Sequence, residues 1–249
     1  MDAVHPHGAA MVRKLESHAP LADDEKAAVL RLPLVFRAVA ADQDVVREGD
    51  RPIECCLVVE GFACRYALTN EGRRQILSFH IPGDIPDLQS LHLTVMDHSL
   101  ATLVPSKLAF IQHEDLRALL RSHPRLGDLF WRETLIDAAI FRQWMVGLGR
   151  RSAHSQMAHL LCELLVRLRA VSLVEDYAFK LPVTQAELGD ALGLSTVHVN
   201  RVLQDLRSEG IISLHGGSLT VLDWEGLKSA GEFDPAYLHL VRTEAALNA

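Results

Sequence analysis

The most informative stretch of this 249-residue chain, residues 184–222, predicts two short helices joined by a tight turn. Thr184 and Glu187 have the spacing of a capping box, in which each side chain satisfies a free amide at a helix start. Gly193 suits the left-handed backbone that ends such a helix, and Ser195 can cap the next one. The second helix would bury the apolar residues at helical spacing, which are Val199, Val202, Leu203 and Leu206. Two helices around a glycine-containing turn predict a helix-turn-helix.

A hairpin and a polar helix face extend this prediction. Gly216 and Gly217 separate two β-rich runs, which predicts a two-residue turn and a β-wing beside the second helix. Arginine can donate two hydrogen bonds to guanine, asparagine or glutamine can pair with adenine, and a helix N-terminus attracts phosphate. The predicted DNA-binding residues are Thr184, Ser195, Thr196, Val197, His198, Asn200, Arg201 and Gln204. The alternative is a solvated helix face in an ordinary α+β domain.

Residues 34–111 have a different texture, in which short β-rich runs alternate with turn residues. The runs are 34–39, 55–59, 62–68, 75–80, 100–104 and 108–111, and glycines at 49, 61, 72 and 83 punctuate them. Short strands at this spacing are typical of a β-sandwich or jelly-roll barrel. We expect Asn70, Glu71 and Gly72 to form a hairpin tip.

Three helices are predicted between the β-rich region and residue 184. The first covers 113–121, and Pro124 favours the start of a long second helix. Its apolar residues form two stripes, Leu126, Leu129, Ile136 and Ile140 on one and Phe130, Phe141 and Trp144 on the other. Such a helix can contact its own barrel and a second chain at once, although packing within one chain is the alternative. We expect Gly147 and Gly149 to break this helix as a hinge, before a third helix over 152–173.

The composition narrows the function classes. Hydrophobic residues make up 49% and charged residues 23%, which excludes a disordered chain. No apolar run is long enough to cross a bilayer, and the N-terminus lacks the pattern of a secretory signal, so we expect a cytoplasmic protein with no membrane partner. The formal charge of −7 argues against coating nucleic acid by bulk charge. Residues 148–222 carry seven basic and seven acidic side chains. DNA affinity must therefore come from the placement of a few cations and from the binding of two half-sites by a dimer. We expect DNA binding to depend only weakly on salt concentration.

Cysteines and histidines give no clear metal site. Cys55, Cys56, Cys64 and Cys162 contain no C-x-x-C pair, so they are expected to be buried apolar residues. The H-x-H spacing of His5 and His7 could ligate a metal, but a loosely docked terminus is the preferred interpretation of residues 1–27. No metal site, catalytic residue or cofactor is predicted.

The order of these segments is similar to a known family. Over residues 30–222 the chain resembles the Crp/Fnr family of bacterial transcription regulators, through CLVVEG at 56–61, ILSFHIPGD at 76–84 and VTQAELGDALGLSTVHVNRVL at 183–203. The resemblance implies an α+β fold with an N-terminal jelly-roll β-barrel of the cyclic-nucleotide-binding type, a long dimerisation helix and a C-terminal winged helix-turn-helix. The expected segments are an N-terminal extension (1–27), a β-roll sensor domain (28–122), the dimerisation helix (123–147), the DNA-binding domain (148–222) and a C-terminal extension (223–249).

The resemblance also implies a function. A homodimer would bind a two-fold-symmetric double-stranded DNA operator, with RNA polymerase as a further partner, and would move its DNA-binding domains when the β-roll senses a signal. Arg201 occupies the position of the arginine that the family directs at guanine. Val197 stands where many members have a base-reading glutamate, so the operator should differ, and Val197 can contact a thymine methyl instead.

The ligand segment departs from the family pattern. Members that bind cyclic nucleotides place a Gly-Glu pair and an Arg-Ser pair around the ligand, whereas this chain has Gly83, Asp84 and Asp87 in the first region and His98 and Ser99 in the second. These five residues are the expected effector pocket, but no Lys or Arg lies between 83 and 99, and a cyclic phosphate needs a fixed cation. We therefore expect no physiological cAMP binding, and the effector is unknown. Because residues 1–54 contain no cysteine, the iron–sulfur cluster of another branch is not expected.

Two alternatives stay open at this stage. One is a regulator that binds DNA constitutively without a ligand. The other is a jelly-roll metal enzyme with an accessory helical domain, which would need a His/Glu metal set on inward strand positions. Since the β-rich runs show no such set, the chain is predicted not to be an enzyme.

Overall fold

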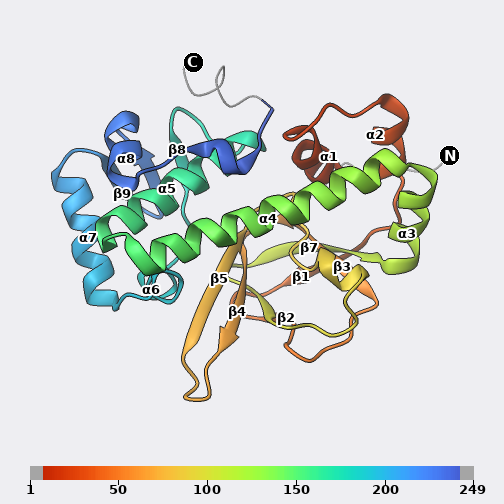
Figure 1. The fold of residues 1–249 in the computed structure, drawn as a ribbon, viewed down its shortest axis with the longest axis horizontal. Coiled ribbons are helices and arrows are strands. Elements are labelled where there is room, and N and C mark those ends of the chain that lie inside the picture. The colour runs from red at the N-terminus through yellow and green to blue at the C-terminus, as the bar shows by residue number, and fades with distance from the viewer. Residues whose placement is uncertain (1–7, 242–249) are drawn as a thin grey trace.

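In the computed structural model, which describes residues 8–241, a long helix connects a β-roll to a helical C-terminal unit (Figure 1). Helices α1 (Ala9–Glu16) and α2 (Asp23–Leu30) precede the roll and lie beside the first half of that long helix. The fold is therefore α+β, as the sequence predicts, with the β-roll and the predicted DNA-binding unit at opposite ends.

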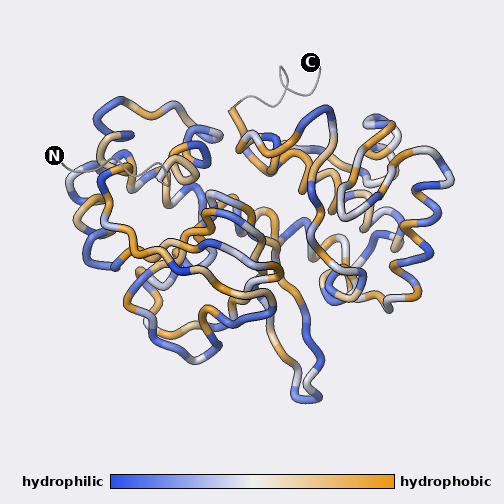
Figure 2. Tube along the Cα trace, turned by 180° about the vertical axis from the view of Figure 1, so that it is seen from behind, coloured by the Kyte–Doolittle hydropathy of each residue, from blue (hydrophilic) through white to orange (hydrophobic). Residues whose placement is uncertain are grey.

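The β-roll consists of two antiparallel sheets. Its strands are β1 (Val35–Val39), β2 (Asp44–Val46), β3 (Glu54–Glu60), β4 (Ala63–Leu68), β5 (Arg74–His80), β6 (Ser99–Thr102) and β7 (Ser106–Gln112). The sheet orders are β1-β7-β3 and β2-β6-β4-β5. All six predicted runs are strands, whereas β2 was missed because three residues carry too little periodicity. The β4–β5 hairpin projects from the body with a hydrophilic tip at 70–72, as predicted (Figure 2).

Helix α3 (His113–Ser122) leads directly into α4 (Pro124–Arg150), which has 27 residues and starts at the predicted proline. The predicted break at Gly147 and Gly149 is wrong, because the helix continues through both. An interior glycine costs a helix only about 1 kcal/mol, and Gly147 O accepts a hydrogen bond of 2.6 Å from Gln156 Nε2. The chain turns instead at Arg151, which has extended backbone dihedrals.

The expected dimer stripe of α4 is also wrong. Leu126, Leu129, Ile136 and Ile140 are all buried within this chain, as are Phe130 and Trp144 of the second stripe. Both stripes pack within one molecule: Leu126, Leu129 and Phe130 join the core beneath α1 and α2, whereas Ile136, Ile140 and Trp144 join the core of the C-terminal unit. The alternative of packing within one chain is therefore correct for these residues.

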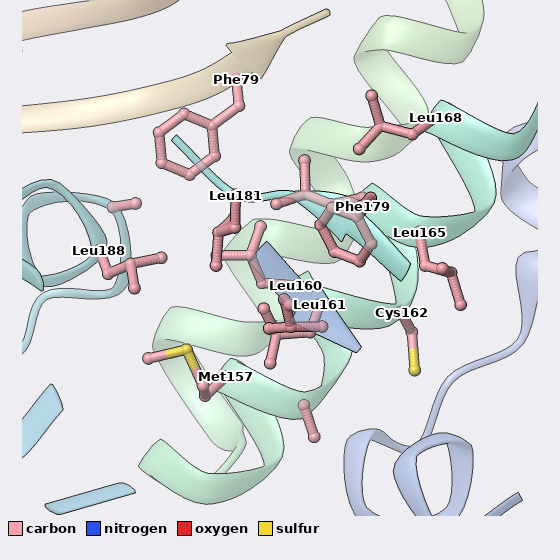
Figure 3. Packing of buried hydrophobic residues seen from close by; sticks show 14 of the residues in the cluster. Phe79, Met157, Leu160, Leu161, Cys162, Leu165, Leu168, Phe179, Leu181 and Leu188 are labelled. Carbon is pink, nitrogen blue, oxygen red and sulfur yellow. The ribbon is translucent and has the colours of Figure 1, made fainter. Parts of the chain in front are cut away.

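The C-terminal unit is built around α5 (Ala153–Ala170), whose six predicted core residues are all buried. Around it lie β8 (Ala178–Lys180), α6 (Gln185–Leu192), α7 (Thr196–Ser208), β9 (Ile212–His215), β10 (Ser218–Val221), α8 (Trp224–Gly231) and the 3₁₀ helix η3 (Pro235–Leu238). Phe79 of β5 reaches into this core beside Leu181 and the leucines of α5 (Figure 3). The roll and the C-terminal unit therefore share one hydrophobic core, which restrains their relative position.

Both ends of the described chain are docked. The expectation of a loosely held N-terminal segment is wrong for residues 8–27, because Met11 and Leu15 of α1 are fully buried; His5 and His7 lie outside the described residues. After η3 the chain returns to α1, where Val241 N donates to Ser17 O at 2.9 Å. The C-terminal segment thus connects the helical unit to the N-terminal helices. Among residues 8–241, no helix has the length and apolar character that a membrane crossing requires.

Candidate nucleic-acid interface

The helix-turn-helix is formed by the predicted local interactions. Thr184 N donates to Glu187 Oε2 at 2.6 Å, and Glu187 N donates to Thr184 Oγ1 at 3.2 Å, which completes the capping box. Gly193 ends α6 with a φ of +66°, in the left-handed region that favours glycine. Ser195 Oγ accepts a hydrogen bond from His198 N at 3.3 Å and caps α7. These contacts fix the direction in which α7 leaves the turn.

Helix α7 has one buried and one exposed face. Val199, Val202, Leu203 and Leu206 are buried, as predicted. On the other side, Thr196, Arg201 and Gln204 are exposed, and the side chain of Val197 is 81% exposed. His198 and Asn200 are half-buried at the edge of this face. Helix α7 therefore presents an arginine, a glutamine and an exposed apolar group together.

Three of the predicted DNA-binding residues are already engaged inside the chain. Asn200 Nδ2 donates to Gln185 Oε1 of α6 at 3.2 Å, which leaves Oδ1 of Asn200 as its remaining acceptor. The hydroxyls of Thr184 and Ser195 serve as helix caps. Gln185 was not predicted, and only the spatial arrangement of the two helices reveals this contact.

The wing is a three-stranded antiparallel sheet in the order β8-β10-β9. Ser218 pairs with His215, so Gly216 and Gly217 form a two-residue turn, with φ values of +58° and +77°. This is the predicted hairpin. Strand β8 was missed because it is three residues long.

The β4–β5 hairpin of the roll contacts the helix-turn-helix directly. Arg74 Nε lies 2.8 Å from Asp190 Oδ2, and Gln75 Nε2 donates to Ala191 O at 3.2 Å. Asp190 and Ala191 belong to α6, the helix that precedes the turn. The β-roll therefore touches the helix-turn-helix at a second place besides the shared core.

A cavity of about 280 Å³ lies between the roll, α1 and α4. Gly83, Asp84 and His98 of the expected effector pocket line it, but Asp87 and Ser99 do not. Asp87 is buried beneath β3, where Oδ1 accepts a hydrogen bond from Cys56 N at 2.7 Å. Ser99 Oγ accepts from Glu48 N at 3.1 Å. Both side chains are used to hold loops, and neither lines this cavity.

The cavity contains cations that the sequence pattern did not reveal, because they come from distant segments. They are Lys14 of α1, Arg65 of β4 and Arg167 of α5. Arg65 pairs with Asp137 of α4 and donates through Nε to Pro86 O at 2.6 Å. Arg167 Nη2 lies 2.9 Å from Asp84 Oδ2, and its Nη1 lies 3.2 Å from Glu163 Oε1. Each cation is thus already paired with a carboxylate of this chain.

Burial and pairing shift the pKa values of the cavity groups in opposite directions. Burial alone would raise the pKa of Asp84, but Lys14 and Arg167 outweigh it and hold that pKa well below its ordinary value. Burial raises the pKa of Glu133 to about 7 against the opposing effect of Lys14. Burial and nearby cations lower the pKa of His18 to about 3 and of His80 to about 4. At neutral pH these imidazoles are uncharged, and Asp84 is ionised.

Within residues 8–241, no cluster of three or more His, Cys, Asp or Glu side chains is arranged to hold a metal ion. All four cysteines are free and buried, and burial raises the pKa of Cys64 to about 12. Thiols in such surroundings are protonated and unreactive.

Comparisons with known proteins agree with this architecture. A model described as a cyclic nucleotide-binding domain matches residues 36–123, and one described as a Crp-like helix-turn-helix domain matches residues 155–230. Fold and site together define a DNA-binding transcription regulator with a sensor-type β-roll, and not an enzyme. The chain belongs to the Crp/Fnr family.

Individual relatives cover most of the chain. The nitrogen fixation regulation protein FixK of Bradyrhizobium diazoefficiens is 33% identical over 189 residues, which are 74% of this chain and 76% of that protein. The transcriptional activator protein FnrL of Cereibacter sphaeroides is 28% identical over 197 residues, 78% of this chain and 79% of that protein. The structure of FixK2 from Bradyrhizobium japonicum has a TM-score of 0.73 at 24% identity and covers 80% of this chain and 98% of that one, which shows the shared fold.

Proposed function

We propose that this regulator acts in the cytoplasm as a homodimer on a two-fold-symmetric operator, with a sensor roll that does not respond to cAMP. The observation that carries the dimer is an exposed seam on α4. Its residues are Trp131, Leu135, Ala138, Arg142, Met145 and Gly149, which recur at alternating intervals of four and three; Ala138 is half-buried and lines the cavity, and the other five are exposed. This is the heptad spacing of a coiled coil, and it lies on a different face from the stripe expected from the sequence.

The exposure of this seam supports a second copy as its occupant. The side chains of Trp131 and Met145 are 65% and 72% exposed, and Leu135 is 51% exposed. Apolar side chains of this size gathered along one helix typically mark a protein interface. A parallel pair of α4 helices would relate two copies of α7 by a two-fold axis, so that each could enter a major groove about 34 Å from the other.

In this arrangement the exposed face of α7 reads the bases. Arg201 donates to guanine, Gln204 is available to adenine, and Val197 contacts a thymine methyl. Asn200 contributes through its free Oδ1 acceptor, while the capped helix ends at Thr184 and Ser195 offer backbone amides to phosphate. The name of FnrL, a transcriptional activator, supports RNA polymerase as a further partner.

The ion pairs that the cavity arginines form within the chain support the proposed lack of a cAMP response. A cyclic phosphate would have to take Arg65 or Arg167 from a carboxylate of the same chain. Breaking a buried ion pair is costly because it leaves an uncompensated charge. In a direct titration, we expect no cAMP binding at concentrations that saturate a cAMP-responsive member of the family; binding of comparable strength would refute this part of the proposal.

Selection of bound sequences from random DNA tests the dimer and the operator together. We expect an inverted repeat whose half-sites are one helical turn apart, with a conserved guanine in each half. Enrichment of a single half-site without symmetry would overturn the dimeric proposal, and no enrichment would overturn the DNA-reading role of α7.

A further inference from the structure

Helix α1 closes the cavity between the roll and α4. Met11, Lys14 and Leu15 of this helix line it, and the helix rests directly on Gly83. Gly83 has a φ of +100°, and a Cβ built there would lie 2.8 Å from Ala10 O and 2.9 Å from Lys14 Cβ. A side chain at position 83 would therefore displace the helix, so the glycine is suited to close docking of α1.

Lys14 extends from α1 into the charged side of the cavity. Its Nζ lies 3.0 Å from Asp84 Oδ1 of the roll and 3.6 Å from Glu133 Oε2 of α4. The lysine side chain is only 12% exposed. Burial lowers the pKa of Lys14, but Asp84 and Glu133 together outweigh that effect and keep the ammonium charged. One cation of the N-terminal helix thus joins the sensor roll to the helix proposed to form the dimer.

The contact continues into the DNA-binding unit. Asp84, which accepts Lys14 on Oδ1, accepts Arg167 of α5 on Oδ2 at 2.9 Å. Arg167 in turn pairs with Glu163, and Tyr237 of the C-terminal segment donates to Glu163 Oε2 at 2.8 Å. A single chain of buried polar contacts therefore runs from α1 through the cavity wall to α5 and η3.

We propose that α1 is the resident ligand of the sensor cavity, with the primary ammonium of Lys14 in place of a diffusible effector, and that docking of α1 holds the DNA-binding unit in its operator-competent position. This inference rests on the proposed function as an operator-binding regulator. Without Lys14, Glu133 loses its lysine partner, and the only other basic group within 4.0 Å of it in the described part of the chain is His18. Among the described residues, Asp84 would then keep Arg167 as its only lysine or arginine partner, which weakens the ion-pair link between α1, the roll and α5.

The wild-type protein provides the first test. Protein stripped of small molecules by charcoal treatment and dialysis should bind the selected operator with the same Kd as untreated protein. Operator binding that requires an added cyclic nucleotide or a small-molecule cell extract would overturn the inference but leave the proposed function intact. This measurement needs no variant, so it decides the matter even if a substitution prevents folding.

Substitution of the lysine with chemical rescue provides the second test. Lys14→Ala should weaken operator binding at least tenfold, and n-propylammonium at millimolar concentration should restore it, because this cation replaces the part of the side chain beyond Cβ. Tetramethylammonium at equal ionic strength should not restore binding, since it has no N–H to donate. Lys26→Ala is the matched control, because Lys26 forms a half-exposed ion pair with Glu16 outside the cavity, and its operator affinity should stay within twofold of wild type. A folded Lys14→Ala protein that binds the operator within twofold of wild type would overturn the inference.

Discussion

The exposed face of α7 and the cavity beneath α1 are two polar regions of the same chain with opposite states. On α7, Arg201 and Gln204 are exposed and form no side-chain hydrogen bond or ion pair among the described residues. In the cavity, Lys14, Arg65 and Arg167 each have a carboxylate partner. Donors that are free in the isolated protein can be used by a ligand at little cost, whereas paired and buried donors must first break an existing contact. The exposed donors of α7 are therefore available to an external ligand, whereas the donors of the cavity are already paired within the chain.

We expect the largest effect from substitutions in the exposed seam of α4, because they should separate the two copies of α7 that a dimer brings together. Replacing both Leu135 and Met145 by Asp should separate the dimer, because it places like charges along the exposed seam of α4. Operator affinity should then fall by about a hundred- to ten-thousandfold, since the second half-site no longer adds its contacts. Analytical ultracentrifugation and operator titration measure the two results. Replacing Glu225 and Glu232 by Asp, which leaves the seam unchanged, serves as the control, and a dimeric Leu135→Asp/Met145→Asp protein would contradict the proposed interface.

The next largest effect is on the stability of the fold, when the ion pairs of Arg167 in the cavity are removed. Arg167→Met should destabilise the fold by about 3–5 kcal/mol, because it leaves Glu163 and Asp84 buried with less compensation. Lys14 still pairs with Asp84, so we expect a value toward the lower end. Denaturant unfolding measures the change. Arg207→Met, at an exposed position of α7, should change stability by less than about 0.5 kcal/mol; equal effects of the two substitutions would show that the buried pairs are not required.

On the DNA-reading side, Arg201→Ala should weaken operator binding by about 1–3 kcal/mol and relax the preference at one base pair of each half-site. Competition titrations with operators altered at each position measure this. Arg207→Ala is the comparison, because an arginine outside the reading face should affect all sequences alike. Unchanged discrimination in the Arg201→Ala protein would remove its assigned role.

The smallest effect is a pH dependence that arises in the cavity. Because burial raises the pKa of Glu133 to about 7, the folded state binds a proton there more tightly than the unfolded state does. This contribution stabilises the fold at pH 5 and is lost as pH rises toward 8. Glu133→Gln cannot lose a proton, so the Tm of the variant should rise relative to wild type between pH 5.5 and pH 8.5. A constant difference in Tm over that range would contradict the raised pKa.

The sequence predicts the DNA-binding unit well for a physical reason. Its helix caps, glycine turn and hairpin depend on residues within four positions of one another, such as Thr184 with Glu187 and Ser195 with His198. Local patterns of this kind specify their own geometry. Six of the seven strands of the roll were predicted on the same basis.

The cavity could not be predicted in the same way, because its residues come from six separate segments. Lys14 and Asp84 are 70 positions apart, and Arg167 bonds to Asp84 across 83 positions. The lack of Lys and Arg between 83 and 99 therefore gave no information on Lys14, Arg65 and Arg167, which lie outside that range. The error on α4 has a related cause, since an apolar stripe shows that a face is buried but not which partner buries it. An arginine between Cys64 and Tyr66 in a β-rich run is a local signal that could have pointed to the cavity, but its burial shows only in the structure.

The contact between the β4–β5 hairpin and α6 has a consequence for engineering. Arg74 and Gln75 of the β-roll contact Asp190 and the carbonyl oxygen of Ala191 in α6. The β-roll therefore forms part of the surface on which the helix-turn-helix packs. A chimera that joins the last hundred residues of a relative to this roll would combine a β4–β5 hairpin and an α6 whose side chains do not match at this contact. Exchange of the hairpin together with α6 as one cassette is therefore the more promising route to altered operator choice with intact signalling.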